Sequence, residues 1–257
     1  MNLFSKYRYY FSSLFTLGWH VRNWGVFAQV LRGTPAVLHL RSGLRFQVRS
    51  LMDVWVIKET CVDGDYEFDE AESGVIVDIG AGLGDYAILK AAENESNKIY
   101  ALEPFADSFE LLKTNIALNE VNNVVPLPLA ISGTTGELLL EATGEAVQHT
   151  TTSSTVAGRS SGVLHVQAKS LDDFFAEQQI ETCVFLKVDC EGSEFDILFN
   201  SSAETLARIK RIGLEFHNGY TAFNDQDLAN FLERHGFAVT RQRNPVHGYL
   251  GLIFAKR

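Results

Sequence analysis

Acidic side chains are missing from the first part of this chain. Residues 1–50 contain none of the 32 Asp and Glu residues but seven of the 22 Lys and Arg residues, a charge of +7. Residues 51–257 hold 15 basic against 32 acidic side chains, a charge of −17. Affinity for nucleic acid phosphates comes mainly from Lys and Arg, so this acidic body argues against a nucleic acid partner.

Cysteine is scarce, and long apolar runs are missing too. The chain has three cysteines, Cys61, Cys183 and Cys190. Their odd number and the lack of a CxxC spacing argue against a disulfide framework and against a zinc site. No stretch reaches the ~20 apolar residues of a membrane-spanning helix. The basic start could be a transit peptide, but it runs on into a predicted hairpin, residues 37–48, that belongs to the fold. We therefore expect a cytoplasmic protein.

From residue 75 onward, short β-rich runs alternate with helical patterns, an order typical of a parallel sheet covered by helices. We expect an α/β fold: a doubly wound, mostly parallel seven-stranded sheet with helices on both faces and a C-terminal antiparallel hairpin. The expected strands are Val75–Ile79, Lys98–Leu102, Asn122–Ile131, Cys183–Val188, Ile212–Phe216, Phe237–Arg241 and Tyr249–Phe254. A further hairpin, Leu138–Ala142 with Val163–Gln167, encloses a polar loop.

The acid-free start is expected to form an N-terminal helix and hairpin, residues 1–52, ahead of a main domain, residues 53–257. Apolar residues at spacings of three and four predict an amphipathic helix over residues 1–32, strained at Gly18 and Gly25. Such a helix either packs on its own domain or on a second subunit, or lies on an anionic membrane. We rank packing first, because soluble domains commonly carry an amphipathic helix against the sheet.

The strongest motif is VDIGAGLGD at residues 77–85, between an expected strand and an expected helix. Its glycines are Gly80, Gly82 and Gly84. They let the backbone turn sharply and approach a ligand, and the helix N-terminus behind them offers free N–H groups. A dinucleotide-binding fingerprint would have a glycine where this chain has Asp85, and here Asp78 precedes the glycines. We expect Asp78 and the three glycines to bind a cofactor.

Glu103 follows Asp78 by 25 positions, in IYALEP at the end of the second expected strand. A carboxylate at that place can accept hydrogen bonds from both hydroxyls of a ribose. Glu103 is therefore a second candidate for cofactor binding.

Acidic residues also gather at the carboxyl ends of two further strands. FLKVDCEGSE places Asp189, Glu191 and Glu194 after one strand, and GLEFHN places Glu215 and His217 at the end of the next. Ligands of open α/β sheets bind at these carboxyl ends. S-adenosylmethionine carries a sulfonium and an ammonium group, so an acid-lined site suits it better than a dinucleotide pyrophosphate, which needs N–H groups and Arg.

In this order the motifs resemble the FkbM-type methyltransferases, a branch of the class I S-adenosylmethionine-dependent fold. The resemblance runs from about Asp53 to Phe254 and rests on DIGAGLG, YALEP with FELLKTNIALN, SLDDFF, KVDCEGSE and LEFHN. It implies S-adenosylmethionine as the cofactor. The residues that it assigns to the cofactor are Asp78, Gly80 and Gly84 at the methionine part, Glu103 at the ribose, Ala130 to Ser132 at the adenine edge, and Asp189 facing the reactive methyl. It also suggests that Glu59 and Tyr66 touch the cofactor or the substrate.

Methyl transfer needs an acceptor oxygen held in line and a group that takes its proton. His217 suits a base at neutral pH, since an ordinary histidine has a pKa of about 6.5. Asp189 and Glu215 could instead take the proton, hold an acceptor hydroxyl or bind a divalent cation through their oxygens. A structural role for His217 is an equally good interpretation, and we assign no residue as a metal ligand.

These features favour an O-methyltransferase, with a hydroxyl on a sugar, a glycan or a secondary metabolite as the acceptor that the resemblance implies. Two alternatives stay open. One is a non-catalytic subunit that only binds the cofactor, and the other is a nicotinamide-dependent oxidoreductase, which Asp85 and the acidic lining disfavour. The acceptor and the oligomeric state are left open by the sequence.

Overall fold

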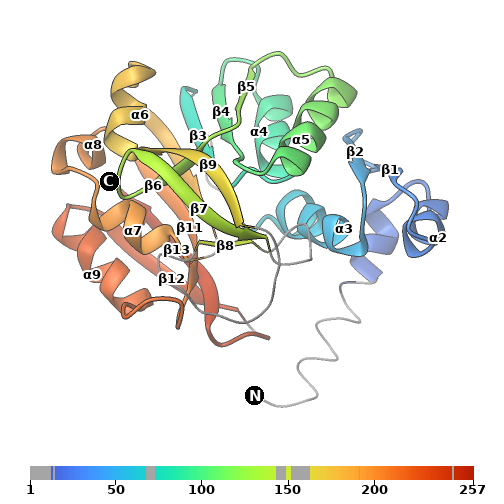
Figure 1. Ribbon diagram of the computed structural model, residues 1–257. Coiled ribbons are helices and arrows are strands. Elements are labelled where there is room, and N and C mark those ends of the chain that lie inside the picture. The colour runs from blue at the N-terminus through green and yellow to red at the C-terminus, as the bar shows by residue number, and fades with distance from the viewer. Residues whose placement is uncertain are drawn as a thin grey trace.

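The computed structural model describes all residues except 1–12, 14, 68–72, 143–148, 152–162, 191 and 245. Its main sheet has seven strands in the order β12-β13-β11-β10-β3-β4-β5 (Figure 1). These strands are β3 (Val75–Ile79), β4 (Lys98–Leu102), β5 (Val124–Leu127), β10 (Cys183–Val188), β11 (Arg211–His217), β12 (Ala238–Arg243) and β13 (Leu250–Lys256). The strands from β11 to β5 are parallel, and β13 and β12 form an antiparallel hairpin at one edge. The expected fold class is confirmed.

Helices cover both faces of the main sheet (Figure 1). One face carries α4 (Asp85–Glu93) and α5 (Ala106–Asn119), and the other carries α6 (Leu171–Glu177), α7 (Glu194–Phe199), α8 (Ala203–Ala207) and α9 (Asp225–Arg234). Strand alternation explains the division. In β3, Val77 packs in the cluster that contains Phe174 of α6, whereas Ile76 packs with Tyr86 of α4.

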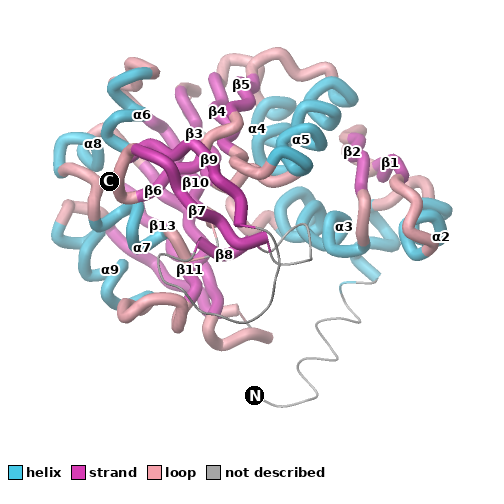
Figure 2. Tube along the Cα trace, viewed as in Figure 1, coloured by secondary structure: helices cyan, strands magenta, loops and turns pink. Residues whose placement is uncertain are grey.

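Two smaller sheets accompany the main one, as Figure 2 shows with all strands in one colour. The first is the antiparallel pair β1 (Ala36–His39) and β2 (Arg45–Val48). The second has the order β6-β9-β7-β8, with β6 (Ala130–Ser132), β7 (Gly136–Ala142), β8 (His149–Thr151) and β9 (Val163–Ser170). Both predicted hairpins are therefore present. Most of the polar loop between β7 and β9 lies outside the described residues.

The strand expected over Asn122–Ile131 is two strands, and the prediction of one was wrong. β5 belongs to the main sheet, whereas β6 pairs with β9. The break comes at Pro128, which has no N–H to donate to a neighbouring strand. Around this proline the chain makes a tight turn, in which the Leu129 N–H donates to the Leu127 carbonyl at 2.9 Å.

The continuous helix expected over residues 1–32 is interrupted in its described part. A helical segment reaches His20, and α2 (Gly25–Leu31) begins five residues later. Between them the chain bonds to the first hairpin: the Arg22 N–H donates to the His39 carbonyl at 2.8 Å, and the Asn23 amide donates to the Val37 carbonyl at 2.7 Å. Pairing with a neighbouring strand thus replaces one helical turn. Residues 1–12 and 14 of the predicted helix lie outside the described residues.

Two elements that the sequence did not reveal follow the first hairpin: α3 (Leu51–Lys58) and the π-helix η1 (Glu59–Asp63). Ser50 and Asp53 form a capping box at the start of α3. The domain boundary expected between residues 52 and 53 falls inside α3, whose Val54 packs in one apolar cluster with the N-terminal segment. None of the described helices is long and apolar enough to cross a membrane.

Candidate active site

A cavity of about 810 Å³ lies at the carboxyl ends of β3, β4, β10 and β11. Seven of the predicted site residues line it: Gly80, Gly82, Glu103, Ala130, Asp189, Glu215 and His217. α3, β6 and β13 also contribute walls. The carboxyl edge of the parallel strands thus holds the site, as expected for an open α/β sheet.

The glycine loop forms one wall of the cavity, and its glycines have different roles. Gly80 has φ +76°, and a Cβ there would lie 1.8 Å from the Asp189 carbonyl oxygen, so only glycine fits between the two strand ends. Gly82 has φ +53° and open space around its Cα, which leaves this part of the backbone free to meet a ligand. Gly84 instead permits helix packing, because a Cβ there would lie 2.5 Å from Leu112 of α5.

Glu103 lies against the glycine loop from the end of β4. Its Oε2 accepts a hydrogen bond from the Gly82 N–H at 2.9 Å, and its Oε1 accepts one from the Phe105 N–H at 2.9 Å. Burial raises the pKa of Glu103 to about 7, against the lowering effect of these two bonds. Each carboxylate oxygen has a second lone pair, so Glu103 can accept two ligand hydroxyls while keeping both backbone bonds.

The raised pKa of Glu103 predicts a pH-dependent stability. The pKa is 4.5 for an ordinary Glu and about 7 for Glu103 in the folded protein, so the folded state binds the proton more tightly than the unfolded state. The free energy of unfolding therefore falls as the pH rises from 4.5 to about 7. Because the Glu103→Gln variant cannot titrate there, we expect its stability relative to the wild type to rise by ~3 kcal/mol between pH 5 and 8. Urea unfolding at both pH values measures this change. A stability difference that does not vary with pH would contradict the prediction.

Behind the loop, Asp78 forms a buried ion pair that the sequence did not predict. Lys187 is its register partner on β10, and the Lys187 Nζ lies 3.1 Å from the Asp78 Oδ1. Burial raises the pKa of Asp78, and Lys187 opposes this effect. Asp78 therefore lies beneath the site rather than in the cavity lining. A lysine inside the otherwise apolar strand CVFLKV was the available signal.

Asp189 is held in place by one hydrogen-bond donor and one nearby cation. The Tyr66 hydroxyl donates to the Asp189 Oδ2 at 3.1 Å, and the Lys187 Nζ lies 3.6 Å from the same oxygen. Burial is the main cause that raises the pKa of Tyr66, and the negative charge of Asp189 is the second. The Tyr66 hydroxyl therefore keeps its proton and remains a neutral donor. Glu59 also lines the cavity, and its Oε1 accepts a hydrogen bond from the Trp55 indole at 2.7 Å.

His217 is buried and fixed by Glu194, a second unexpected partner. The His217 Nδ1 lies 3.0 Å from the Glu194 Oε1, which also accepts the N–H groups of Cys190 at 3.3 Å and Gly192 at 3.1 Å. Burial lowers the pKa of His217, but the bond to Glu194 and the nearby carboxylates outweigh it and raise the pKa to about 10. His217 therefore holds its proton at neutral pH and is a cation there, unlike an ordinary histidine.

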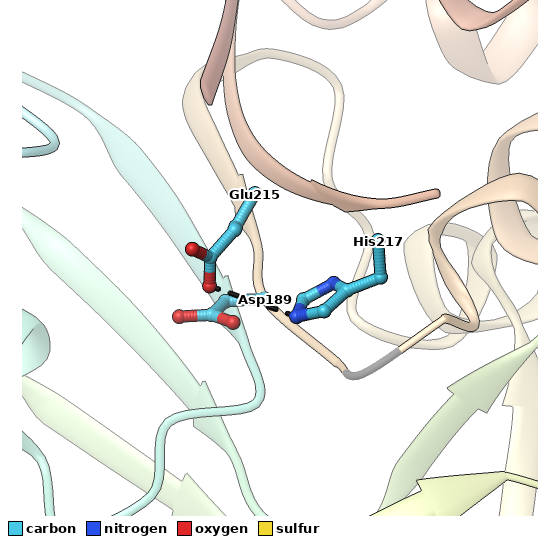
Figure 3. A group of neighbouring side chains, drawn as sticks. All are labelled: Asp189, Glu215 and His217. Carbon is cyan, nitrogen blue, oxygen red and sulfur yellow. Dashed lines mark ion pairs between the residues drawn. The ribbon is translucent and has the colours of Figure 1, made fainter. Parts of the chain in front are cut away.

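The side chains of Asp189, Glu215 and His217 converge at the cavity (Figure 3). Glu215 and His217 are two positions apart on β11 and so point to the same face, with the His217 Nε2 3.7 Å from the Glu215 Oε2. One ligand atom from each of the three residues lies within 4.8 Å of the others. The two carboxylates of this group can take a proton, hold an acceptor hydroxyl or bind a divalent cation through their oxygens. Glu191, the remaining acid of this motif, lies outside the described residues.

Comparison with known proteins yields one family and several relatives. The model of the methyltransferase FkbM domain matches residues 78–239. Methyltransferase sdnD of Sordaria araneosa is 25% identical over 240 residues, which are 82% of this chain and 92% of sdnD. A tRNA(Phe) (4-demethylwyosine(37)-C(7)) aminocarboxypropyltransferase of Methanocaldococcus jannaschii is 37% identical over 60 residues, 23% of this chain and 24% of its own.

Among solved structures, the crystal structure of methyltransferase FkbM from Methylobacillus flagellatus KT is similar, with a TM-score of 0.49 and 14% identity. The match covers 71% of this chain and 43% of that chain.

Proposed function

We propose that this chain, which belongs to the FkbM methyltransferase family and is an S-adenosylmethionine-dependent methyltransferase, methylates a hydroxyl oxygen of a sugar, a glycan or a secondary metabolite. The observation that carries the proposal is the convergence of Asp189, Glu215 and His217 beside the Glu103 wall of one cavity. The family match also leaves the oxidoreductase alternative without support.

The residues present fit this cofactor. Glu103 offers acceptor oxygens for ribose hydroxyls, the open backbone at Gly82 allows close approach, and Ala130 lines the same cavity for the adenine edge. Asp189 brings negative charge, which suits a ligand with a sulfonium and an ammonium group. When bound, S-adenosylmethionine supplies a methyl group that is activated by its positively charged sulfur.

The chain's own part in the reaction is to position the acceptor and take its proton. A hydroxyl oxygen that gains a carbon must lose its proton, and only a group that is unprotonated at working pH can accept it. With a pKa of about 10, His217 is protonated at neutral pH. We therefore assign the proton to the carboxylates of Asp189 and Glu215, whose ligand oxygens lie within 4.8 Å of each other.

His217 and Lys187 then act as fixed positive charges around this pair. The Lys187 Nζ is 3.6 Å from Asp189, and the His217 Nε2 is 3.7 Å from Glu215. Two carboxylates facing one cavity repel each other, and the two cations offset that repulsion. Glu194 and Tyr66 are positioning residues in this scheme, since each orients a side chain that faces the cavity.

A transfer assay tests the proposed acceptor class. The protein is incubated with methyl-labelled S-adenosylmethionine and a panel of sugars, glycans and polyketide alcohols, each paired with its deoxy analogue as a control. We expect label in at least one hydroxyl compound and none in its deoxy partner. Tight binding of S-adenosylhomocysteine without transfer to any acceptor would favour the non-catalytic subunit.

A further inference from the structure

In its described part, residues 13 and 15–32, the N-terminal segment has two apolar faces, and one of them is not buried by the described fold. One face packs against β1, β2 and α3, with Val21 fully buried. The other carries four large side chains that are 75, 69, 56 and 70% exposed: Phe15, Trp19, Trp24 and Leu31. Packing on the chain's own domain therefore accounts for one face of the segment, and the other face remains available to a partner.

The exposed side chains belong to one surface rather than to scattered positions. Phe15 and Trp19 are one helical turn apart. The Trp24 ring lies against Gly18, where an added Cβ would come within 2.9 Å of it. Trp24 also lies 5.8 Å from the Phe27 ring, centroid to centroid. The interruption at residues 21–24 thus brings the aromatic side chains of both helical segments together.

Three exposed arginines lie in or next to these segments: Arg22, whose guanidinium donates to the Arg41 carbonyl at 3.2 Å, Arg41 itself, and Arg32, which follows Leu31 directly in the chain. The Arg41 guanidinium lies 5.9 Å from the centroid of the Trp19 ring, so the charge and the aromatic face are directly associated. No acidic residue occurs in residues 1–50, although the rest of the chain carries −17. We call the four exposed apolar residues and these three arginines the docking surface.

We propose that the docking surface binds the headgroup region of an anionic phospholipid bilayer. Tryptophan favours that region because its ring is apolar and its N–H is polar, and arginine pairs with lipid phosphates. The charge of this surface is complementary to an anionic membrane, whereas the same surface of a second copy, facing it in a two-fold dimer, would bring charge of the same positive sign.

α3 connects the docking surface to the cavity. Val54 of α3 packs in the same apolar cluster as Val26 and Val30 of α2. On the same helix, Leu51 and Met52 line the cavity and are 45 and 39% exposed. In Figure 1, α3 lies between α2 and the main sheet. Membrane docking would therefore place the α3 wall of the cavity near the bilayer.

Vesicle flotation of the full chain tests the proposal. We expect the protein to float with vesicles of phosphatidylglycerol and phosphatidylcholine and not with phosphatidylcholine alone, and to detach as salt is raised. The double variant Trp19→Ser/Trp24→Ser and the charge reversal Arg22→Glu/Arg32→Glu should each reduce the bound fraction about tenfold or more. S-adenosylhomocysteine affinity should be unchanged in both, which shows that they fold.

The matched control is Leu139→Ser/Leu164→Ser, which removes two exposed apolar side chains from β7 and β9. It should float like the wild type. Equal flotation on neutral and anionic vesicles, or wild-type flotation of the tryptophan variant, would overturn the proposal. So would a wild-type dimer in light scattering that the tryptophan variant converts to a monomer, because the surface would then be an interface between copies.

Discussion

The double variant Asp189→Asn/Glu215→Gln is expected to lower kcat for methyl transfer about a thousandfold, within the usual 10²–10⁴ range for loss of a general base. Both amides keep the size of the side chains that line the cavity, but neither accepts a proton at neutral pH. The amide oxygen introduced at position 189 can still accept the hydrogen bond from the Tyr66 hydroxyl, so the local structure is retained. Single-turnover measurements with labelled cofactor report the loss.

The control for this prediction is Asp107→Asn/Glu120→Gln, the same pair of chemical changes at two exposed positions that do not line the cavity. It should keep wild-type kcat. The affinity of the Asp189 and Glu215 variant for S-adenosylhomocysteine, which lacks the transferred methyl, should change less than about tenfold, or ~1.4 kcal/mol. A kcat within a few-fold of wild type would remove the carboxylate pair from the proposed chemistry.

Glu103→Ala is expected to weaken S-adenosylhomocysteine binding about 100-fold, or ~2.7 kcal/mol. The reason is the loss of the two hydrogen bonds that Glu103 accepts from the ribose hydroxyls. Each is worth ~0.5–1.5 kcal/mol, the range for an uncharged partner, because Glu103 with a pKa of about 7 is only partly ionised at neutral pH. Removing Glu103 also frees the N–H groups of Gly82 and Phe105, which loosens the loop that the ligand meets. Isothermal titration calorimetry measures the Kd directly.

Glu110→Ala is the matched control for this experiment, because Glu110 is exposed on α5 and lies away from the cavity. Its Kd should equal that of the wild type. Since Glu103→Ala could also lower stability, its thermal unfolding is recorded alongside. A folded Glu103→Ala protein with wild-type affinity would contradict the ribose role.

Features that depend on neighbouring residues were predictable from the sequence. The glycine loop, with its strand before and helix after, is a local pattern, and β3, β4 and β10 have the bounds that were expected. Glu103 could be found because a β-α-β unit fixes which strand end comes next to the loop. The carboxyl edge of the sheet then brought Asp189, Glu215 and His217 together by topology alone.

Contacts between distant segments could not be predicted in this way. Tyr66 reaches Asp189 across 123 positions, and Glu194 reaches His217 across 23. No periodic pattern encodes such pairs, yet they decide the charge of His217 and the orientation of Asp189. The same limit explains the interrupted N-terminal helix, since its break is made by bonds to the hairpin that begins at Ala36.

Whether the methyl group reaches a hydroxyl oxygen beside the Asp189 and Glu215 carboxylates can be seen in the product itself. The most direct measurement is carbon NMR of the product formed from methyl-¹³C S-adenosylmethionine, with the wild type and the Asp189→Asn/Glu215→Gln variant in parallel. We expect a labelled methoxy carbon from the wild type and about a thousandfold less of it from the variant. A label on nitrogen or carbon, or equal methoxy formation by both proteins, would contradict it.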